Sequence, residues 1–165
     1  MKRVIIRRKR ERKTDYKNRI GLLKSGRPRV SVRKTNKFLV VQLIKSSEAK
    51  DKVVMGVNSK ELLSQGLDKK FENPLKSIPA AYLTGYIVGK KIVEKLKDKE
   101  VILDLGLQKT LAGSRLYGVL KGLVDAGVNI PCDEKVFPSE ERISGKHLKE
   151  DVQKAFENLK SKIVK

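Results

Sequence analysis

Residues 29–44 read RVSVRKTNKFLVVQLI, and the first half of this segment alternates strictly between two kinds of side chain. Val30 and Val32 occupy one side of the alternation. The polar side is made of Arg29, Ser31 and Arg33. Such a two-residue period is typical of a half-buried β-strand, here with a basic outer face.

A polar turn at 34–37, KTNK, separates this strand from the apolar run at 38–44. The two segments therefore predict a β-hairpin with a cationic tip. A third strand is expected at 52–57. The alternation makes Arg33 and Gln42 candidates for one face of the sheet, with the register across the turn left open.

Beyond the hairpin the period changes to that of helices and then returns to a strand. We predict a helix over 77–97, with Ser77 as N-cap and with Ala81, Gly85 and Gly89 in one stripe that lets another element approach closely. A short strand follows at 100–105.

A second amphipathic helix is expected over 114–126, and Gly127 follows it as a C-terminal cap. Leu116, Leu120, Leu123 and Val124 form its expected inner face. Residues 128–145 are expected to be loop.

The two ends of the chain add one helix each. A short helix is predicted up to Lys24, capped by Thr14 or Asp15, with Tyr16, Ile20 and Leu23 facing inward. A last helix is predicted over 146–163. The expected fold is a single α/β domain over 14–165, with a small mixed β-sheet covered by α-helices and an extended basic N-terminal arm at 1–13.

Charge is the most unusual property of the sequence. The 165 residues include 39 Lys and Arg against 19 Asp and Glu, a net charge of +20. Residues 1–50 hold 18 basic and three acidic side chains, so +15 of the excess lies in the first third. This distribution favours a polyanionic partner, with nucleic acid the best candidate.

Residues 1–13 carry eight basic side chains and one acidic, which predicts an arm that stays extended until phosphates neutralise it. A solvated tail or a sorting address is the alternative. An anionic membrane surface fits less well, because Val4, Ile5 and Ile6 are consecutive and form no helical stripe. No segment has the length of a membrane span or the layout of a signal peptide, so a soluble intracellular protein is expected.

Catalytic chemistry has few candidates in this sequence. His147 is the only histidine and Cys132 the only cysteine, which leaves His-based triads and zinc sites without ligands. Asp104 and Asp125 could hold a metal ion in an RNA-processing enzyme, and this stays as the alternative function. No metal or cofactor is otherwise expected.

The loop 106–115, GLQKTLAGSR, lies between a predicted strand and a predicted helix but departs from the P-loop spacing. Ser114 and Arg115 would form an anion site at the start of the helix, or Ser114 would be a plain helix cap. Aromatic residues are few, with four Tyr, four Phe and no Trp, so recognition of phosphates and shape is expected rather than base stacking.

Residues 7–44 resemble the archaeal and eukaryotic type of the large-subunit ribosomal protein L-eighteen family. Further similar blocks follow in the family's order: AAYLTG at 80–85, ILDLGL at 102–107, GSRLYGVLKGLVDAGVNIP at 113–131, FP at 137–138 and RISGKHL at 142–148. The resemblance covers essentially the whole chain, and its length favours the archaeal type.

This resemblance implies a structural, non-catalytic function. A member of the family would bind 5S ribosomal RNA, sit in the central protuberance of the large ribosomal subunit in the cytoplasm, and contact large-subunit ribosomal RNA and neighbouring ribosomal proteins. No membrane and no cofactor are implied.

Residues and resemblance together give three groups of candidate RNA contacts. The arm would contact phosphates through Arg7, Arg8, Arg10, Arg12 and Lys13, with Thr14 and Tyr16 anchoring its junction to the fold. The hairpin would contribute Arg27, Arg29, Arg33, Lys34, Thr35, Asn36, Lys37 and Gln42. Among these, Asn36 and Gln42 could contact base edges or 2′-hydroxyls. Ser114 and Arg115 form the third group.

Overall fold

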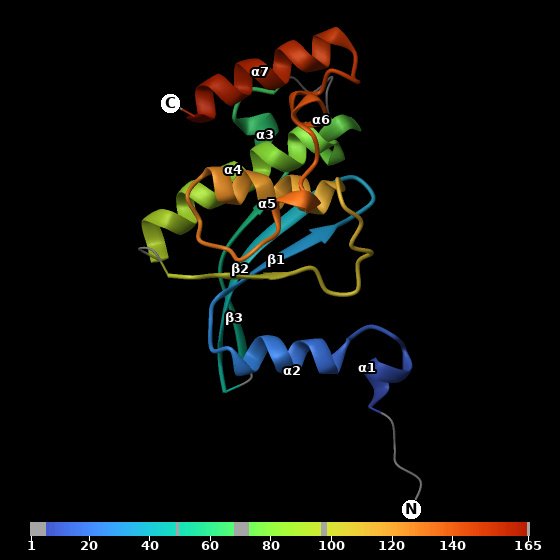
Figure 1. Cartoon of the computed structure of the whole chain (residues 1–165), viewed down its shortest axis with the longest axis vertical. Coiled ribbons are helices and arrows are strands. Elements are labelled where there is room, and N and C mark those ends of the chain that lie inside the picture. Colours follow the sequence, from blue (N-terminus) through green and yellow to red (C-terminus); the bar gives the residue numbers. More distant parts are fainter. Residues whose placement is uncertain (1–5, 49, 68–72, 97–98, 165) are drawn as a thin grey trace, which may run out of the picture.

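The computed structural model describes residues 6–48, 50–67, 73–96 and 99–164. Within these ranges the strands form one four-stranded mixed sheet in the order β3-β2-β1-β4 (Figure 1). The strands are β1 (Arg29–Lys34), β2 (Leu39–Ser47), β3 (Lys50–Asn58) and β4 (Ile102–Asp104). The predicted α/β fold with a small mixed sheet is thereby confirmed.

The predicted hairpin forms, and its register fixes which residues share a face. β1 and β2 pair antiparallel with Ser31 opposite Gln42, so Arg33 and Gln42 lie on the same face of the sheet, as expected. β2 and β3 are also antiparallel, with a bulge at Leu43/Ile44. β4 pairs parallel to β1, with Ser31 opposite Asp104.

Two helices, α4 (Ile78–Leu96) and α5 (Arg115–Asp125), cover the apolar face of the sheet. The predicted small-residue stripe is confirmed, because a Cβ added at Gly85 would lie 2.2 Å from the Val119 carbonyl oxygen and one at Gly89 would lie 2.4 Å from Ala126 Cβ. α5 also has a glycine at the contact: a Cβ at Gly122 would lie 2.2 Å from the Tyr82 carbonyl oxygen of α4. The two helices are therefore in backbone contact.

α4 also supports a second apolar cluster on its far side. This cluster joins α4 to α3 (Glu61–Ser64), the 3₁₀ helix η2 (Asn73–Lys76) and α7 (Glu150–Val164). Phe156 and Leu159 of α7 are buried in it. α7 begins at Glu150, later than the predicted residue 146, so Leu148 precedes the helix.

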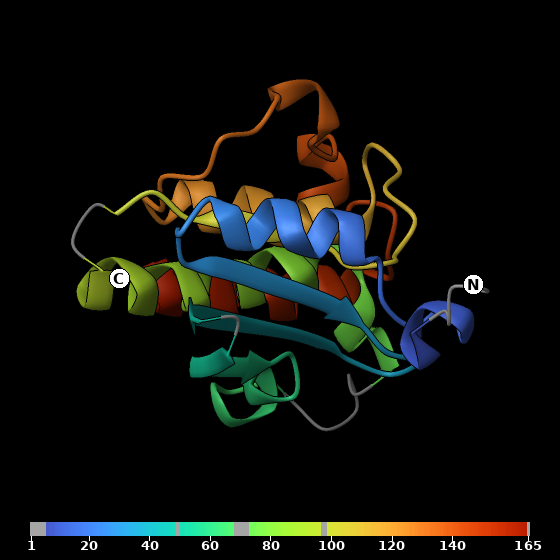
Figure 2. The same ribbon diagram turned by 90° about the horizontal axis from the view of Figure 1, so that it is seen from below.

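α2 (Tyr16–Lys24) lies on the opposite, polar face of the sheet (Figures 1 and 2). Its N-cap is Asp15, whose Oδ1 accepts hydrogen bonds from the backbone N–H groups of Lys17 and Asn18. The predicted inner face is wrong at Ile20, which is 51% exposed. An ion pair rather than apolar packing positions the helix: the Arg19 guanidinium lies 2.9 Å from Asp51 of β3.

The described part of the arm contains one short helix, α1 (Arg7–Arg10), where an extended chain was predicted. Residues 1–5 of the arm, and the predicted last residue of the 77–97 helix, lie outside the described residues. Two further short elements, η3 (Glu134–Val136) and α6 (Glu140–Ser144), lie in the segment predicted as loop.

Candidate nucleic-acid interface

One edge of the sheet collects most of the predicted contact residues. β1 and β4 are parallel, so their carboxyl ends at Lys34 and Asp104 lie at the same edge. The hairpin tip follows β1 there, and the loop that leads to Ser114 and Arg115 follows β4. Two groups of candidates that lie about 80 positions apart in the sequence are thereby brought to one side of the molecule.

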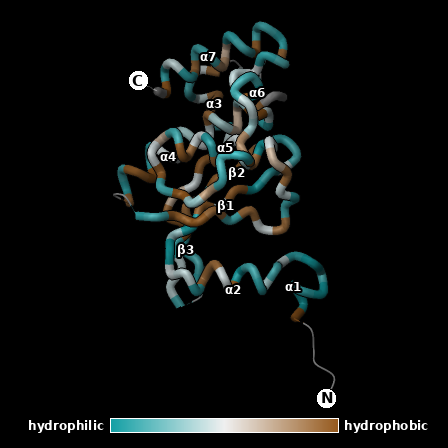
Figure 3. Tube along the Cα trace, in the orientation of Figure 1, coloured by the Kyte–Doolittle hydropathy of each residue, from teal (hydrophilic) through white to brown (hydrophobic). Residues whose placement is uncertain are grey.

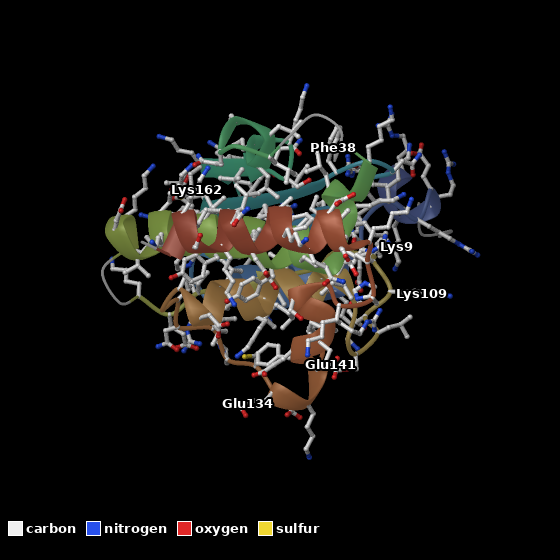
Figure 4. The ribbon with its side chains drawn as sticks, turned by 90° about the horizontal axis from the view of Figure 1, so that it is seen from above. Lys9, Phe38, Lys109, Glu134, Glu141 and Lys162 are labelled. Atoms are coloured by element: carbon white, nitrogen blue, oxygen red, sulfur yellow. The ribbon has the colours of Figure 1, made fainter. Side chains whose placement is uncertain are left out.

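The arm reaches the same edge. Arg8 Nε donates to Thr14 Oγ1 at 2.9 Å, which ties α1 to the start of α2. Arg8 and Lys13 line a cleft together with Leu107 and Gln108 of the loop after β4. Figure 4 shows Lys9 of the arm and Lys109 of that loop on the same side of the molecule, away from Glu134 and Glu141.

The cationic residues of the arm are held only lightly by the rest of the fold. All five predicted contacts, Arg7, Arg8, Arg10, Arg12 and Lys13, are exposed. Glu11 pairs with Lys13 at 2.8 Å and approaches Arg7 at 3.6 Å. Exposed ion pairs of this kind stabilise weakly, so a phosphate can replace the carboxylate. Thr14 accepts the Arg8 hydrogen bond at the junction, while Tyr16 is half-buried at the first position of α2.

The hairpin tip is rigid and exposed. Thr35 closes the turn: its Oγ1 donates to the Phe38 carbonyl oxygen at 2.8 Å and accepts from the Phe38 N–H at 2.9 Å. The Lys76 ammonium donates to the Asn36 carbonyl oxygen at 3.0 Å. The Lys34, Asn36 and Lys37 side chains all face solvent. The tip therefore presents two cations and an amide on a fixed backbone.

Arg29 does not lie on an exposed face, contrary to the sequence prediction. It is 4% exposed, and its Nη2 lies 2.6 Å from Asp51 Oδ1. The strand alternation placed Arg29 correctly beside Ser31 and Arg33, but α2 folds over that face and buries Arg29 beneath it. Burial of a cation is tolerated because Asp51 neutralises it.

Asp51, which is itself exposed, is the centre of this contact. Its carboxylate receives Arg29, Arg19 and the Ser46 hydroxyl, the last at 2.7 Å. Burial by itself raises the pKa of Asp51, but the Ser46 hydrogen bond and the two guanidinium groups outweigh it and leave the pKa lower than the usual value of 3.8. The carboxylate therefore stays charged and links α2 to three strands.

Arg33 is partly available. Its Nη2 lies 3.0 Å from Asp104 Oδ1 and its Nη1 donates to the Asp104 carbonyl oxygen at 2.7 Å, yet 38% of the side chain remains exposed. Asp104 Oδ1 also accepts the Gly106 N–H at 2.9 Å. Arg33 is thus preorganised at the mouth of the cleft.

The remaining candidates are less well grouped. Arg27 lies at the opposite end of β1, paired with Glu100. Gln42 is half-buried in the middle of β2, against Gly56 of β3. Ser114 is the N-cap of α5, but its hydroxyl is buried and makes no hydrogen bond within the described residues, while Arg115 is half-buried.

Two contributors were missing from the sequence prediction. Arg19 and Gln108 line the same cleft as Arg8 and Arg33. Arg19 belongs to a predicted helix, and Gln108 to a loop considered only for phosphate binding, so neither carried a local signal. The proximity of the two comes from the docking of α2 on the sheet.

The two carboxylates considered for catalysis lie apart and are both engaged. Asp104 pairs with Arg33, whereas Asp125 accepts the Tyr82 hydroxyl at 3.0 Å and pairs with Lys121 at 2.9 Å. No group of three His, Cys, Asp or Glu side chains able to hold a metal ion occurs among the described residues. In the same part of the chain, no helix is long and apolar enough to cross a membrane.

Comparison with known proteins agrees with this picture of a basic, non-catalytic surface. Residues 2–102 and 97–133 match the family described as ribosomal large subunit proteins 60S L5 and 50S L18. The large ribosomal subunit protein uL18 of Methanothrix thermoacetophila is 43% identical over 166 residues, which span 98% of this chain and 95% of that protein.

Two other archaeal proteins of the same name are similarly close. The uL18 protein of Korarchaeum cryptofilum is 43% identical over 94% of this chain and 77% of its own length. That of Methanococcus maripaludis is 42% identical over 89% of this chain and 74% of its own length. All three relatives are named as proteins of the large ribosomal subunit. The match runs from the basic arm into the α4–α5 layer, and on this evidence the chain belongs to the family of ribosomal large-subunit proteins 60S L5 and 50S L18.

Proposed function

We propose that the chain binds 5S ribosomal RNA and helps to hold it in the central protuberance of the large ribosomal subunit. Large-subunit ribosomal RNA and neighbouring ribosomal proteins are its other partners, and it works in the cytoplasm, in the ribosome. The observation that carries the proposal is the gathering of cations at one edge of the sheet: Arg8 and Lys13 of the arm and Arg33 of β1 line one cleft there, and the hairpin tip follows β1 at the same edge.

The arm supplies affinity without sequence preference. Its five exposed cations face solvent from a short helix and a loop, and each can release a counterion when it neutralises a phosphate. The arm is joined to the fold by the Arg8–Thr14 hydrogen bond, which directs it along the same edge as the hairpin tip.

The hairpin tip supplies orientation and part of the specificity. Lys34 and Lys37 contact phosphates, and Asn36 donates to or accepts from a base edge or a 2′-hydroxyl. Arg33 reaches the RNA from the end of β1, while Arg115 forms a second contact at the start of α5, where the buried Ser114 hydroxyl does not take part. Arg29 supports this surface from beneath, since its guanidinium is buried.

The proposal is tested by filter binding of the full chain to labelled 5S ribosomal RNA and to an unrelated duplex RNA of equal length, at fixed salt with magnesium. Tighter, stoichiometric binding of 5S RNA without cleavage is expected. Equal affinity for both RNAs would reject 5S recognition, and multiple-turnover cleavage would favour the RNA-processing alternative.

Deletion of residues 1–13 should flatten the salt dependence of this binding. The segment has a net charge of +7, and a partial engagement of its cations predicts a loss of about 3 to 5 units from the slope of log K against log salt. An unchanged slope would show that the arm is not a phosphate contact.

A further inference from the structure

A cleft of about 390 Å³ separates α2 from the sheet at the basic edge. Asn18 and Leu22 of α2 line one wall. Arg33 of β1, with Leu107 and Gln108 of the loop after β4, lines the other. The size lies within the range of pockets that hold small organic ligands, and exceeds what a contact with one surface phosphate requires.

The charge of the cleft favours an anion. Among its described lining residues five are cationic and two are carboxylates. Both carboxylates are engaged: Asp15 accepts two backbone N–H groups of α2, and Asp104 binds Arg33 and the Gly106 N–H. Lys13, Arg19 and Arg29 pair with Glu11 and Asp51, which do not line the cleft, and Arg8 makes no ion pair with the described residues. A concave surface of this sign concentrates negatively charged groups.

Inorganic phosphate alone would leave much of the lining unused. Leu22 and Leu107 are apolar, and Leu107 is 58% exposed at the mouth of the cleft. Gln108 Oε1 is buried and has no hydrogen-bond partner within the described residues. Gln108 lines the cleft, and its amide, once the side chain turns toward a ligand, offers both a donor and an acceptor to a base edge. The lining thus combines phosphate-binding, apolar and amide groups, which are the groups that recognise a nucleotide.

We propose that this cleft takes one unstacked nucleotide of the bound RNA, with its phosphate at the cationic rim and its base against Leu22, Leu107 and Gln108. The inference rests on the proposed function for the identity of the RNA, but not for the chemistry of the ligand. Single-stranded or bulged nucleotides are the ones whose bases can leave the stack and enter such a cleft.

The first test fills the cleft without changing its charge. Asn18→Trp places a large ring in it from α2, and Gly21→Trp places the same ring at an exposed, uncharged position of α2 that does not line the cleft. We expect Asn18→Trp to weaken binding of the full chain to 5S ribosomal RNA about tenfold, because the excluded base loses its apolar contacts with Leu22 and Leu107 and a hydrogen bond to Gln108, and Gly21→Trp to bind as the natural chain does. Equal binding by both variants would overturn the inference and leave 5S recognition intact.

A second variant guards against misfolding of the first. Gln108→Ala removes the amide and opens the cleft, and should weaken 5S binding about fivefold through the lost hydrogen bond. Circular dichroism checks that each variant is folded. If Asn18→Trp is unfolded, the decision passes to Gln108→Ala, and unchanged affinity for that variant would reject the nucleotide contact.

A titration without 5S RNA separates the two proposals. The natural chain, labelled with ¹⁵N, is titrated with AMP, CMP, GMP and UMP, and separately with inorganic phosphate. If the chain shows no preference for 5S RNA, the proposed function fails and this titration decides the cleft. Larger amide shifts at Gly106, Leu107 and Gln108 with nucleotides than with phosphate support a nucleotide site. Equal shifts, or none, would overturn it.

Discussion

The two faces of the sheet are covered in different ways. α4 and α5 lie on the face formed by five fully buried strand residues, Val30, Val32, Leu39, Val41 and Leu43. α2 lies on the other face, and none of its residues Tyr16–Lys24, all of them described, is buried. In Figure 3 brown segments lie along the strands, whereas the tube through α2 carries both teal and brown and that through α1 is teal.

Because the two faces are packed differently, we expect the α4–α5 face to determine stability and the α2 face to serve binding. Apolar contact with backbone-to-backbone packing is tight, so the α4–α5 layer tolerates little change. α2 is held to the sheet by the Arg19–Asp51 ion pair, over a polar face where Asp51 and Asp104 also pair with Arg29 and Arg33; such ion pairs are directional and exchangeable. The partly exposed cations Arg19 and Arg33 can therefore exchange a carboxylate for a phosphate in a complex. We therefore expect substitutions on the two faces to affect different measurements.

The largest effect should follow an added methyl group in the α4–α5 layer. Gly85→Ala places a Cβ 2.2 Å from the Val119 carbonyl oxygen, and that backbone atom cannot move without separating the helices. We expect a loss of about 3 kcal/mol in the free energy of unfolding, the upper part of the range for overpacking. Urea denaturation measures it.

The same substitution on the other face should act in the opposite direction. A Cβ at Gly21 of α2 would meet nothing within 4 Å, so Gly21→Ala should raise stability by about 0.5–1 kcal/mol through helix propensity. If both variants were destabilised alike, the two layers would not differ in packing and the comparison would fail.

The next-largest loss of stability should follow the removal of an ion pair on the face of the sheet that α2 covers. Asp51→Asn keeps the shape of the side chain but leaves the Arg29 guanidinium, 4% exposed, without its nearest countercharge. We expect a loss of about 2 kcal/mol in the free energy of unfolding, because removing one partner strands a buried charge.

Glu94→Gln is the matched control for this change. Glu94 lies on the exposed side of α4 and makes no ion pair with the described residues, so its neutralisation should change stability by less than about 0.5 kcal/mol. Equal losses for both variants would show that overall charge, rather than the Asp51 contact, is responsible.

The Asp51 contribution should also depend on pH. Because the pKa of Asp51 is lowered in the folded protein, its contribution is fully present above the ordinary value of 3.8 and is lost as the pH falls through the lower folded pKa. The difference in unfolding free energy between the natural chain and Asp51→Asn should therefore be constant from pH 7 to about pH 5 and shrink below pH 3.8. If this difference in unfolding free energy were unchanged at pH 2.5, it would come from the shape of the side chain and not from the Asp51 charge.

Local patterns in the sequence predicted the apolar layer well. The stripe of Ala81, Gly85 and Gly89 has helical spacing, and the alternation at Val30 and Val32 has strand spacing, so a few neighbouring residues specify each face. The elements that were missed, such as α3 and α6, have four and five residues, too few for a periodic pattern to emerge.

The polar layer could not be predicted in the same way. The alternation placed Arg29 on the polar face correctly, but the burial of Arg29 depends on α2. That helix is held on the sheet by an ion pair between Arg19 and Asp51, which are far apart in the sequence. Ile20 was expected to face inward because apolar residues usually do, yet the surface beneath α2 is charged. The cleft is formed by segments far apart in the chain, so no local spacing indicates it.

The smallest expected effect concerns specificity at the hairpin tip. Asn36 is exposed, its backbone carbonyl is fixed by Lys76, and its side chain makes no hydrogen bond with the described residues. Asn36→Ala should therefore leave the free energy of unfolding unchanged. It should reduce the difference between the binding free energies for 5S RNA and for unrelated duplex RNA by about 1 kcal/mol, because one contact to a base or 2′-hydroxyl is lost.

Lys37→Ala is the matched control for this test. A substitution of Arg33 would serve less well, because Arg33 is bonded to Asp104 and its loss would also disturb the sheet. Removal of the Lys37 charge should weaken binding to both RNAs alike, since phosphates are common to both. Filter binding at one salt concentration gives, for each of the two variants, the ratio of its affinities for 5S RNA and for unrelated duplex RNA. An unchanged ratio for Asn36→Ala would make Asn36 a turn residue only. Specificity would then have to come from another part of the basic edge, and the cleft beneath α2 is the part with groups able to supply it.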